Sequence, residues 1–316
     1  MKEKYYAFST YLKDIFGEKV YKLPVNLPIT CPNRLDGDGC SFCGEVGTGF
    51  EAMEGHTPVK VQLESTKDHI TKRYGANKFI AYFQNYTNTF MPLNEFKMYL
   101  HEAVEVPDLV GISVSTRPDC IKKSYLDVLN EIKEKCHLKI TVELGLQTVN
   151  YHTLEKINRG HGLGEFIDAV LTIAQYDFDI CTHVILNLPG DEQRDIVECA
   201  KILSALPIKI VKIHSLYIPK NSKLYTEYKN GNINICTKEE YLKRLCEFLA
   251  YLREDMVIER LFSRVPKEDA VFSNWGTSWW KLRDEFEVMM EELGYQQACK
   301  CDYLQGKALN RWGIES

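Results

Sequence analysis

Three cysteines, Cys31, Cys40 and Cys43, lie in the segment ITCPNRLDGDGCSFCGEVG (29–47), which is rich in glycine and aspartate. A structural zinc site takes four ligands and a disulfide joins two cysteines. An iron–sulfur cluster can use three protein thiolates when one iron accepts an outside ligand. The count and spacing therefore favour a cluster with an open iron. A zinc ion that recruits His56 or a distant cysteine is the alternative.

The composition of this segment also suits a bulky inorganic group. Five glycines fall within residues 37–49 and allow the backbone to fold tightly around such a core. Phe42 lies between the last two cysteines, where it can shield a cluster or stack on a planar ligand. Simple packing is the other explanation for this phenylalanine.

The whole-chain composition is that of a soluble globular enzyme: 316 residues, 45% hydrophobic and 26% charged. The formal net charge of −5 argues against a uniformly basic nucleic-acid-binding surface, although a local basic cleft is compatible with it. We find no apolar run typical of a signal peptide or a membrane span. Eleven cysteines without an export signal indicate a reducing compartment, and we expect a cytoplasmic protein that does not associate with membranes.

Strand and helix patterns alternate along most of the chain. The expected strands cover residues 20–28, 78–86, 109–115, 138–146, 179–188 and 208–217. The expected helices cover residues 60–74, 94–104, 122–135, 150–157 with 164–176, and 192–205. This alternation predicts parallel strands joined by right-handed helical crossovers. The cysteines follow the first strand, where a dinucleotide-binding sheet would have a glycine-rich turn.

We therefore predict an α/β fold, a partial (β/α)6 TIM-like barrel whose active face is built by the loops after the strands. Residues 1–19 form an N-terminal segment and 20–217 the barrel. Residues 218–316 form a C-terminal α/β extension that closes the substrate side. It contains an amphipathic helix over 237–254 and a further strand candidate, MVIERLFSR.

Four motifs add a family resemblance to this pattern. They are STRPD (115–119), VELGLQT (142–148), INRGH (157–161) and LNLPGD (186–191), in this order after the cysteine segment. Together they resemble the radical S-adenosylmethionine (SAM) superfamily. The wide spacing of the first two cysteines is similar to the branch that contains the catalytic subunit of Elongator, and within it to the bacterial YhcC/YtqA-type subgroup. The resemblance covers roughly residues 5–260.

The resemblance implies that Cys31, Cys40 and Cys43 hold three irons of a [4Fe-4S] cluster and that SAM chelates the fourth. An electron from a donor such as flavodoxin or ferredoxin would then cleave SAM reductively to a 5′-deoxyadenosyl radical. The protein would orient SAM, exclude water and place one substrate hydrogen near the radical carbon.

Several residues match positions where relatives bind SAM. Thr87 and Asn88 follow the second strand, where many relatives have a glycine-rich turn for the SAM amino group. Ser115 occupies a position where several relatives carry glutamate. A polar strand end is the plain alternative for the first two residues.

Three further cofactor candidates come from the next two strands and the loop between them. Gln147 ends the fourth strand, where related enzymes hydrogen-bond the SAM ribose. Arg159 matches an arginine that pairs with the SAM carboxylate, a role that suits a guanidinium. His183 falls where relatives place a ribose-contacting polar residue, or it is a core histidine bonded to the backbone.

Charged residues on apolar strands are the candidates for catalysis, because a buried charge needs a partner or a purpose. Glu143, Lys212 and His214 meet this description. Glu143 and Lys212 could also form a simple ion pair. The adjacent loops add Arg117, Asp119 and His161.

The same resemblance suggests a tRNA substrate, modified at the C5 side chain of the wobble uridine in a 5-aminomethyluridine-type pathway. A flipped base would enter the barrel mouth, with Lys220, Lys223 and Arg264 as phosphate contacts or as a solvated surface. One alternative is radical modification of a small metabolite or peptide. Another is a zinc-stabilised binding module without enzymatic activity.

Overall fold

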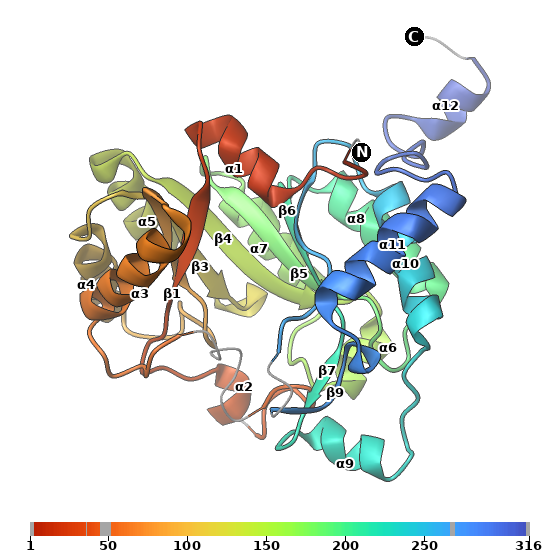
Figure 1. Cartoon of the computed structure of the whole chain (residues 1–316), viewed down its shortest axis with the longest axis horizontal. Helices are drawn as coiled ribbons and strands as arrows, with labels where there is room; N and C mark the ends of the chain where they lie inside the picture. The colour runs from red at the N-terminus through yellow and green to blue at the C-terminus, as the bar shows by residue number, and fades with distance from the viewer. Residues whose placement is uncertain (1–2, 36, 45–51, 266–268, 314–316) are drawn as a thin grey trace.

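A computed structural model describes residues 3–35, 37–44, 52–265 and 269–313. Seven parallel strands form one curled sheet in the order β1-β2-β3-β4-β5-β6-β8 (Figure 1). The strands are β1 (Val20–Val25), β2 (Lys78–Phe83), β3 (Leu109–Thr116), β4 (Lys139–Gln147), β5 (Asp179–Ile185), β6 (Ile210–His214) and β8 (Val257–Arg260). This sheet confirms the predicted α/β partial barrel. Its seventh strand, β8, comes from the predicted C-terminal extension.

Helices connect the strands and cover the outer face of the sheet (Figure 1). The connecting helices are α3 (Val59–Tyr74), α4 (Leu93–Val104), α5 (Lys123–Cys136), α6 (Tyr151–Lys156), α7 (Leu163–Ile173) and α8 (Gln193–Ala205). Local sequence sets their ends. The Asn150 side chain accepts hydrogen bonds from two backbone N–H groups at the start of α6. Gly75, with φ of +63°, ends α3 in the left-handed conformation.

The C-terminal third adds α9 (Lys223–Lys229), α10 (Lys238–Tyr251), α11 (Trp279–Glu292) and α12 (Lys307–Arg311). Thr237 and Glu240 form a capping box at the start of α10, which packs against α8 and α11. A small antiparallel pair, β7 (Tyr217–Pro219) and β9 (Ala270–Ser273), lies beyond the main sheet. Within the described ranges, no helix combines the length and apolar character needed to cross a bilayer.

The two faces of the sheet carry different side chains. Leu23, Phe83, Leu144, Val184 and Ile213 point outward and belong to the main hydrophobic core between sheet and helices. The alternate positions point into the barrel, because successive side chains on a strand face opposite sides. Many of those inner positions are polar, so the barrel interior is a site and not a second apolar core.

The two ends of the barrel differ as well. The helix α1 (Phe8–Phe16) lies across the amino ends of the strands, where Tyr11 and Leu12 pack on Ile80 and Cys181 (Figure 1). The carboxyl ends carry the cysteine segment with α2 (Pro32–Leu35), and β7 lies on the same side. The fold therefore leaves its open end at the loops that follow the strands, as predicted.

Several strands end earlier than the sequence pattern predicts. The first strand ends at Val25 instead of 28, the second at Phe83 instead of 86, and the fifth at Ile185 instead of 188. The apolar runs continue, but the chain leaves the sheet to form the loops of the open end. Tyr86, for example, has a φ of +52°, which no strand accommodates.

Candidate active site

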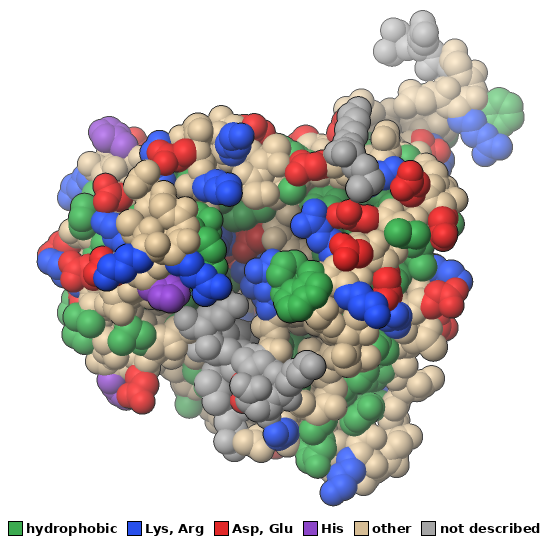
Figure 2. All heavy atoms as spheres, in the orientation of Figure 1, with side chains coloured by type: hydrophobic (Ala, Val, Ile, Leu, Met, Phe, Trp, Pro, Cys, Tyr) green, Lys and Arg blue, Asp and Glu red, His purple; other side chains and the backbone are tan. Residues whose placement is uncertain are grey.

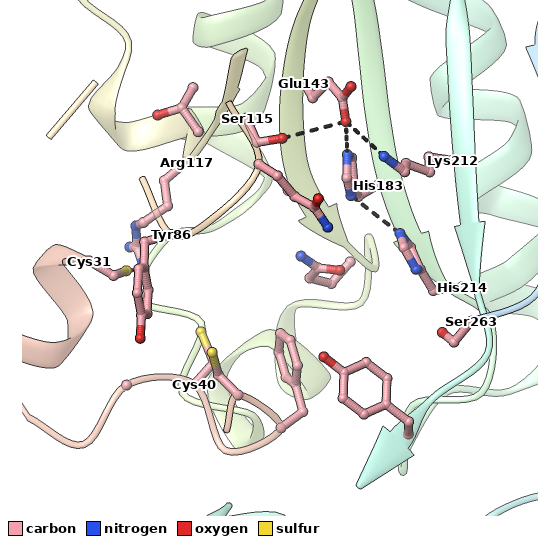
Figure 3. A pocket seen from close by; sticks show the side chains of 18 of the residues that line it. Cys31, Cys40, Tyr86, Ser115, Arg117, Glu143, His183, Lys212, His214 and Ser263 are labelled. Atoms are coloured by element: carbon pink, nitrogen blue, oxygen red, sulfur yellow. Dashed lines mark hydrogen bonds and ion pairs between the residues drawn. The ribbon is translucent and has the colours of Figure 1, made fainter. Parts of the chain in front are cut away.

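The three cysteines face one cavity at the open end of the barrel (Figure 3). The cavity opens to solvent. Cys40 is buried, and Cys31 and Cys43 are half-buried. Backbone bonds hold the segment in place: the N–H of Ser41 donates to the carbonyl of Ile157 at 2.9 Å. The sequence prediction that these thiols gather on the active face is therefore met by their geometry.

Three arginines direct guanidinium groups at the three thiols. Arg159 Nη1 lies 3.4 Å from the Sγ of Cys40, Arg34 Nη2 lies 3.7 Å from that of Cys43, and Arg117 Nη1 lies 3.8 Å from that of Cys31. Burial raises the pKa of the Cys43 thiol, and the Arg34 guanidinium acts in the opposite direction. Positive charge and N–H donors around the sulfurs favour thiolates and anionic groups built on them.

The INRGH motif packs directly against the cysteine segment. The side chain of Asn158 donates to the Gly39 carbonyl at 2.8 Å, and Asn33 donates to the Asn158 carbonyl at 2.5 Å. Gly160 has a φ of +76°, and a Cβ there would lie 2.3 Å from Asn33 Oδ1. Glycine is thus required at this position for both backbone conformation and close approach. The motif positions Arg159 beside Cys40.

The STRPD motif also holds part of the site in position, through Arg117. Arg117 donates to both carboxylate oxygens of Asp119, at 2.9 and 2.7 Å, and to the carbonyl of Arg159 at 3.0 Å. Such a two-pronged contact fixes the guanidinium plane. His161 is buried nearby, and burial together with Arg159 lowers the pKa of its imidazole to about 4. This histidine is therefore neutral at physiological pH.

These residues fit a cluster better than a single metal ion. Among the described residues, the one group of three ligand side chains whose donor atoms all lie within 4.8 Å of one another is Glu143, Cys181 and His183. At least one pair among the three cysteine sulfurs is thus further apart than two ligands of one zinc ion, with Zn–S bonds of about 2.3 Å, could be. The wide spacing, the three thiols and their N–H donors suit an iron–sulfur core.

The predicted SAM contacts fall into two groups. Five of the predicted residues line the cavity: Phe42, Ser115, Gln147, Arg159 and His183. Thr87 and Asn88 are buried and do not line it. The Asn88 amide instead donates to carbonyls of Phe83, Asn85 and Ser115, which ties the ends of β2 and β3 together. The assignment of these residues to SAM stays a prediction.

A close approach beside β4 requires a glycine on this wall. Arg159 donates to the Gly145 carbonyl through Nη2 at 2.6 Å and Nε at 3.2 Å. A Cβ on Gly145 would lie 2.7 Å from Arg159 Nη2 and 2.9 Å from Gln147 Nε2. The VELGLQT motif therefore combines a glycine that admits Arg159 with a glutamine, at φ of +80°, whose side chain turns into the cavity.

A charged quartet of Lys22, Lys212, Glu143 and Glu259, which we call the floor, lies below the cavity. Two of its members, Glu143 and Lys212, are buried and line the cavity. Lys22 contacts Glu143 at 2.6 Å and Glu259 at 2.7 Å. Lys212 contacts the same two carboxylates at 3.2 and 2.9 Å. Burial alone raises the pKa of Glu143, but Lys212 and Lys22 outweigh it and hold the pKa well below its ordinary value. The ion pair proposed for Glu143 and Lys212 is present, within a larger set.

A hydrogen-bonded chain leads from this floor up the cavity wall (Figure 3). His183 Nε2 lies 2.7 Å from Glu143, and His214 Nε2 lies 3.3 Å from His183 Nδ1. Burial lowers the pKa of both imidazoles, that of His214 further because His183 and nearby cations add to it. His183 thus bonds to a carboxylate and not, as one reading of the sequence had it, to the backbone.

Sequence reasoning missed three members of the floor. Lys22 and Glu259 complete the quartet, and the Tyr82 hydroxyl lies 3.1 Å from Glu143 and 2.9 Å from Lys212. The signal used for Glu143 and Lys212, a charge within an apolar strand, is also present in VYKLPV and MVIER. Applying it evenly would have found Lys22 and Glu259. Tyr82, in a strand with several aromatics, gave no such signal.

Of the predicted phosphate contacts, one belongs to the site. Arg264 lines the cavity and stacks on the Trp279 ring at 4.2 Å. Lys223 pairs with Asp38 at 2.6 Å on the surface, and Lys220 is exposed. Neither lysine lines the cavity.

The sequence is similar to those of several known proteins. The protein YtqA of Bacillus subtilis is 30% identical over 93% of this chain and 92% of its own length. Elongator complex protein 3 of Dictyostelium discoideum is 24% identical over 85% of this chain and 52% of its own. A tRNA uridine(34) acetyltransferase of Methanocaldococcus jannaschii is 28% identical over 50% of this chain and 28% of its own.

A solved structure supports the fold. Elp3 of the archaeon Methanocaldococcus infernus superposes with a TM-score of 0.68 over 93% of this chain and 68% of its own, at 16% identity.

Family models cover both parts of the chain. Residues 25–203 match the radical SAM superfamily, and residues 208–292 match the radical SAM C-terminal domain. The first match contains the strands β2 to β5, the three cysteines and the three arginines that face them, and it includes Glu143 and Tyr82 of the floor. The chain belongs to the radical SAM superfamily, and it is an enzyme whose cofactors are a [4Fe-4S] cluster and SAM.

Proposed function

We propose that this radical SAM enzyme acts on tRNA and modifies the C5 side chain of the wobble uridine, in a 5-aminomethyluridine-type pathway. The observation that carries the proposal is the similarity to a tRNA uridine(34) acetyltransferase over half of the chain and to Elongator complex protein 3 over 85% of it. Position 34 of tRNA is the wobble position. The match to Elongator complex protein 3 covers 85% of this chain, so it includes most of the barrel.

The cavity supports a substrate with a planar, polar head. Phe42, Tyr86 and Tyr217 line its walls, and aromatic side chains are the usual stacking partners of an unstacked base. The floor below offers carboxylates, ammonium groups and a phenol, which suit the polar edge of a base or its side chain. An enzyme that works on a base must take it out of the stack, and a deep cavity can receive it.

We assign roles to the residues of this chain according to their position between the mouth and the floor of the cavity. Cys31, Cys40 and Cys43 would hold the cluster at the mouth, and Arg159 and Gln147 would orient SAM beside it. When bound, the cluster and SAM together supply the 5′-deoxyadenosyl radical that removes one substrate hydrogen. The neutral imidazole of His214 faces the cavity and can accept or donate a hydrogen bond to the substrate.

Nucleoside analysis of total tRNA tests the proposal. Cells that lack this protein should lose a modified wobble uridine and accumulate its precursor. The wild-type chain should restore the modification, and the Cys40→Ala variant should not. Cys136→Ala is the matched control, because Cys136 is exposed on α5 and does not line the cavity.

An in vitro assay separates the substrate from the chemistry. The reconstituted enzyme should produce 5′-deoxyadenosine faster when an anticodon stem-loop with the precursor uridine is added. Unchanged wobble uridines in the deletion strain, with intact SAM cleavage in vitro, would reject the tRNA substrate. That result would favour a small metabolite or peptide instead.

A further inference from the structure

A second cavity lies at the seam where the barrel fails to close. The edge strands β1 and β8 flank this seam, and α1 covers its amino end, where Ile258 N–H donates to the Tyr6 carbonyl at 2.8 Å. We call the remaining opening, which is open to solvent, the seam cavity. Its lining includes Phe8, Lys22, Glu259, Arg260, Arg264 and Trp279. The front face of the molecule is hollowed between α1 and α11 (Figure 2).

The seam cavity adjoins the cavity that holds the cysteines. Four residues line both: Tyr82, Lys212, Arg260 and Arg264. A ligand in the seam cavity would therefore reach the floor of the active site from the side, away from the three-cysteine segment.

The two glutamates of the quartet beside this cavity are already paired with cations. Glu143 and Glu259 each contact both Lys22 and Lys212, so two carboxylates meet two ammonium groups. Glu3, also in the lining, is exposed to solvent, and its carboxylate accepts a hydrogen bond from Thr10 at 3.0 Å. The quartet leaves no carboxylate for a further cation.

Arg260 is a third basic residue beside the quartet, after Lys22 and Lys212. It ends β8, lies in register with Lys212 of β6 after an irregularity in the pairing, and is half-buried. Within the described part of the chain, its guanidinium makes no hydrogen bond and no ion pair. Its charge is felt by its neighbours, because it lowers the pKa of His214 and opposes the rise of the Tyr217 pKa. The other two arginines that line the seam cavity have partners: Arg283 pairs with Glu287, and Arg264 lies over the Trp279 ring.

A half-buried guanidinium without a partner is costly unless a ligand supplies one. Arginine offers five N–H donors in a rigid plane that matches a carboxylate or a phosphate with two parallel hydrogen bonds. We propose that the seam cavity is a binding site for an anionic group, a carboxylate or a phosphate, and that Arg260 is its anchor. The inference goes beyond the proposed tRNA substrate, since a nucleotide, an acidic side chain or a second acidic substrate would each present such a group.

Chemical labelling of the anaerobically reconstituted holoenzyme tests the site directly. Phenylglyoxal modifies accessible guanidinium groups, and peptide mass spectrometry reports each arginine separately. Arg260 should react in chloride and be protected several-fold when phosphate or acetate replaces chloride at equal ionic strength. Protection by phosphate alone assigns a phosphate, and protection by acetate alone a carboxylate. Protection by both supports a general anion site.

Two other arginines serve as controls in the same sample. Arg194 is exposed and should react equally in all three salts. Arg253 donates to the carbonyls of Ser204, Leu206 and Ile208 and should stay unreactive. Equal labelling of Arg260 in chloride, phosphate and acetate would overturn the proposal, whether or not tRNA is the substrate.

Variants give a second, independent measurement. An anion that binds only the folded protein raises the melting temperature with concentration. The anion that protects Arg260 should raise the Tm of the wild type and of Arg194→Gln beyond the effect of chloride. Arg260→Gln should lose this rise, and Arg260→Lys should keep part of it. A rise of the same size in Arg260→Gln would contradict the assignment.

Discussion

The two ends of the active-site cavity hold their cations in different ways. At the cysteine end, Arg159 and Arg34 direct N–H groups at sulfur and at backbone carbonyls, and Arg117 alone has a carboxylate partner. At the floor, each of two lysines contacts each of two glutamates. Positive charge is thus in excess over carboxylates at the cysteine end, whereas carboxylates balance it at the floor.

This difference separates binding from positioning. The excess of donors around the thiols is ready for an anionic cofactor, whose charge completes that end. The quartet is complete without a ligand, and it also joins the two edge strands, because Lys22 of β1 contacts Glu259 of β8 across the seam. We infer that removing a residue from the cysteine end removes chemistry, whereas removing one from the floor removes stability first.

The largest expected effect is the loss of the cluster in Cys40→Ala. One of three thiolates disappears, so anaerobic reconstitution should leave no visible iron–sulfur absorption and no SAM cleavage. The barrel should still fold, because its core lies between sheet and helices. Circular dichroism and thermal melting of the apoproteins check this. Global unfolding of the variant would show that the cysteine segment stabilises the fold.

The next largest effect should come from Glu143→Gln. The change leaves two buried ammonium groups with one carboxylate, and breaking a buried ion pair in this way typically costs about 3–5 kcal/mol. Urea denaturation should show a loss of free energy of unfolding in that range. The stabilisation by wild-type Glu143 is present above the ordinary carboxyl pKa and is lost as pH falls through its depressed pKa in the folded state.

A surface glutamate that also contacts two lysines provides the control for Glu143→Gln. Glu131 accepts hydrogen bonds from Lys97 and Lys135 at 2.9 and 2.7 Å, on the exposed side of α5. Glu131→Gln should leave the free energy of unfolding nearly unchanged, because solvent screens exposed pairs. Equal destabilisation by the two changes would contradict the view of the floor as a buried structural element.

The barrel could be predicted from sequence because its signals are local and repeated. Apolar strands and amphipathic helices alternate, and the six predicted strands all appear in the sheet. Several of their carboxyl ends were predicted too long, among them those of β1, β2 and β5, since the apolar run continues where the chain turns into the active-site loops. The short helix α1 and the pairing of β8 with β6 depend on tertiary contacts that no local pattern records.

The site was predictable where a motif encodes it and not where side chains meet across the barrel. The cysteine spacing located the thiols, and INRGH located Arg159. The contact between Lys22 and Glu259 joins residues 237 positions apart, which no spacing in the sequence reveals. Thr87 and Asn88 show the converse, since a strand-end pattern pointed to the cavity but Asn88 ties backbone carbonyls together.

Asp191 is a buried carboxyl group whose pKa is shifted in the opposite direction from that of Glu143. It is buried in the LNLPGD motif, and burial raises its pKa to about 6, partly opposed by the hydroxyls of Thr153 and Thr148. A raised pKa means that the folded state binds the proton more tightly. The contribution of Asp191 to the free energy of unfolding should therefore fall as pH rises from about 4 to about 6, by up to about 3 kcal/mol in total.

Asp191→Asn should remove this pH dependence. The difference in free energy of unfolding between variant and wild type should grow in favour of the variant across that pH interval and stay constant above it. Urea denaturation at a series of pH values measures the difference, and groups common to both proteins cancel. A difference that does not change with pH would mean that Asp191 has an ordinary pKa.

The smallest of these effects should appear in Arg159→Met, at the cysteine end. The variant keeps the thiolates but loses the N–H group 3.4 Å from Cys40 and the bonds to the Gly145 carbonyl. Outer partners of metal ligands typically contribute about 10–100-fold in metal affinity, so the cluster should be lost to a chelator faster by a factor in that range. Loss of a nearby cation should also make the reduction potential more negative, because the reduced cluster carries more negative charge.

Arg194→Met, on the exposed surface, is the control for a lost arginine. If the excess of donors at this end serves the cofactor, chelator sensitivity and potential must change together while the urea midpoint of the apoprotein stays near that of the wild type. A variant that changes only the urea midpoint would place Arg159 with the floor residues, as a structural group.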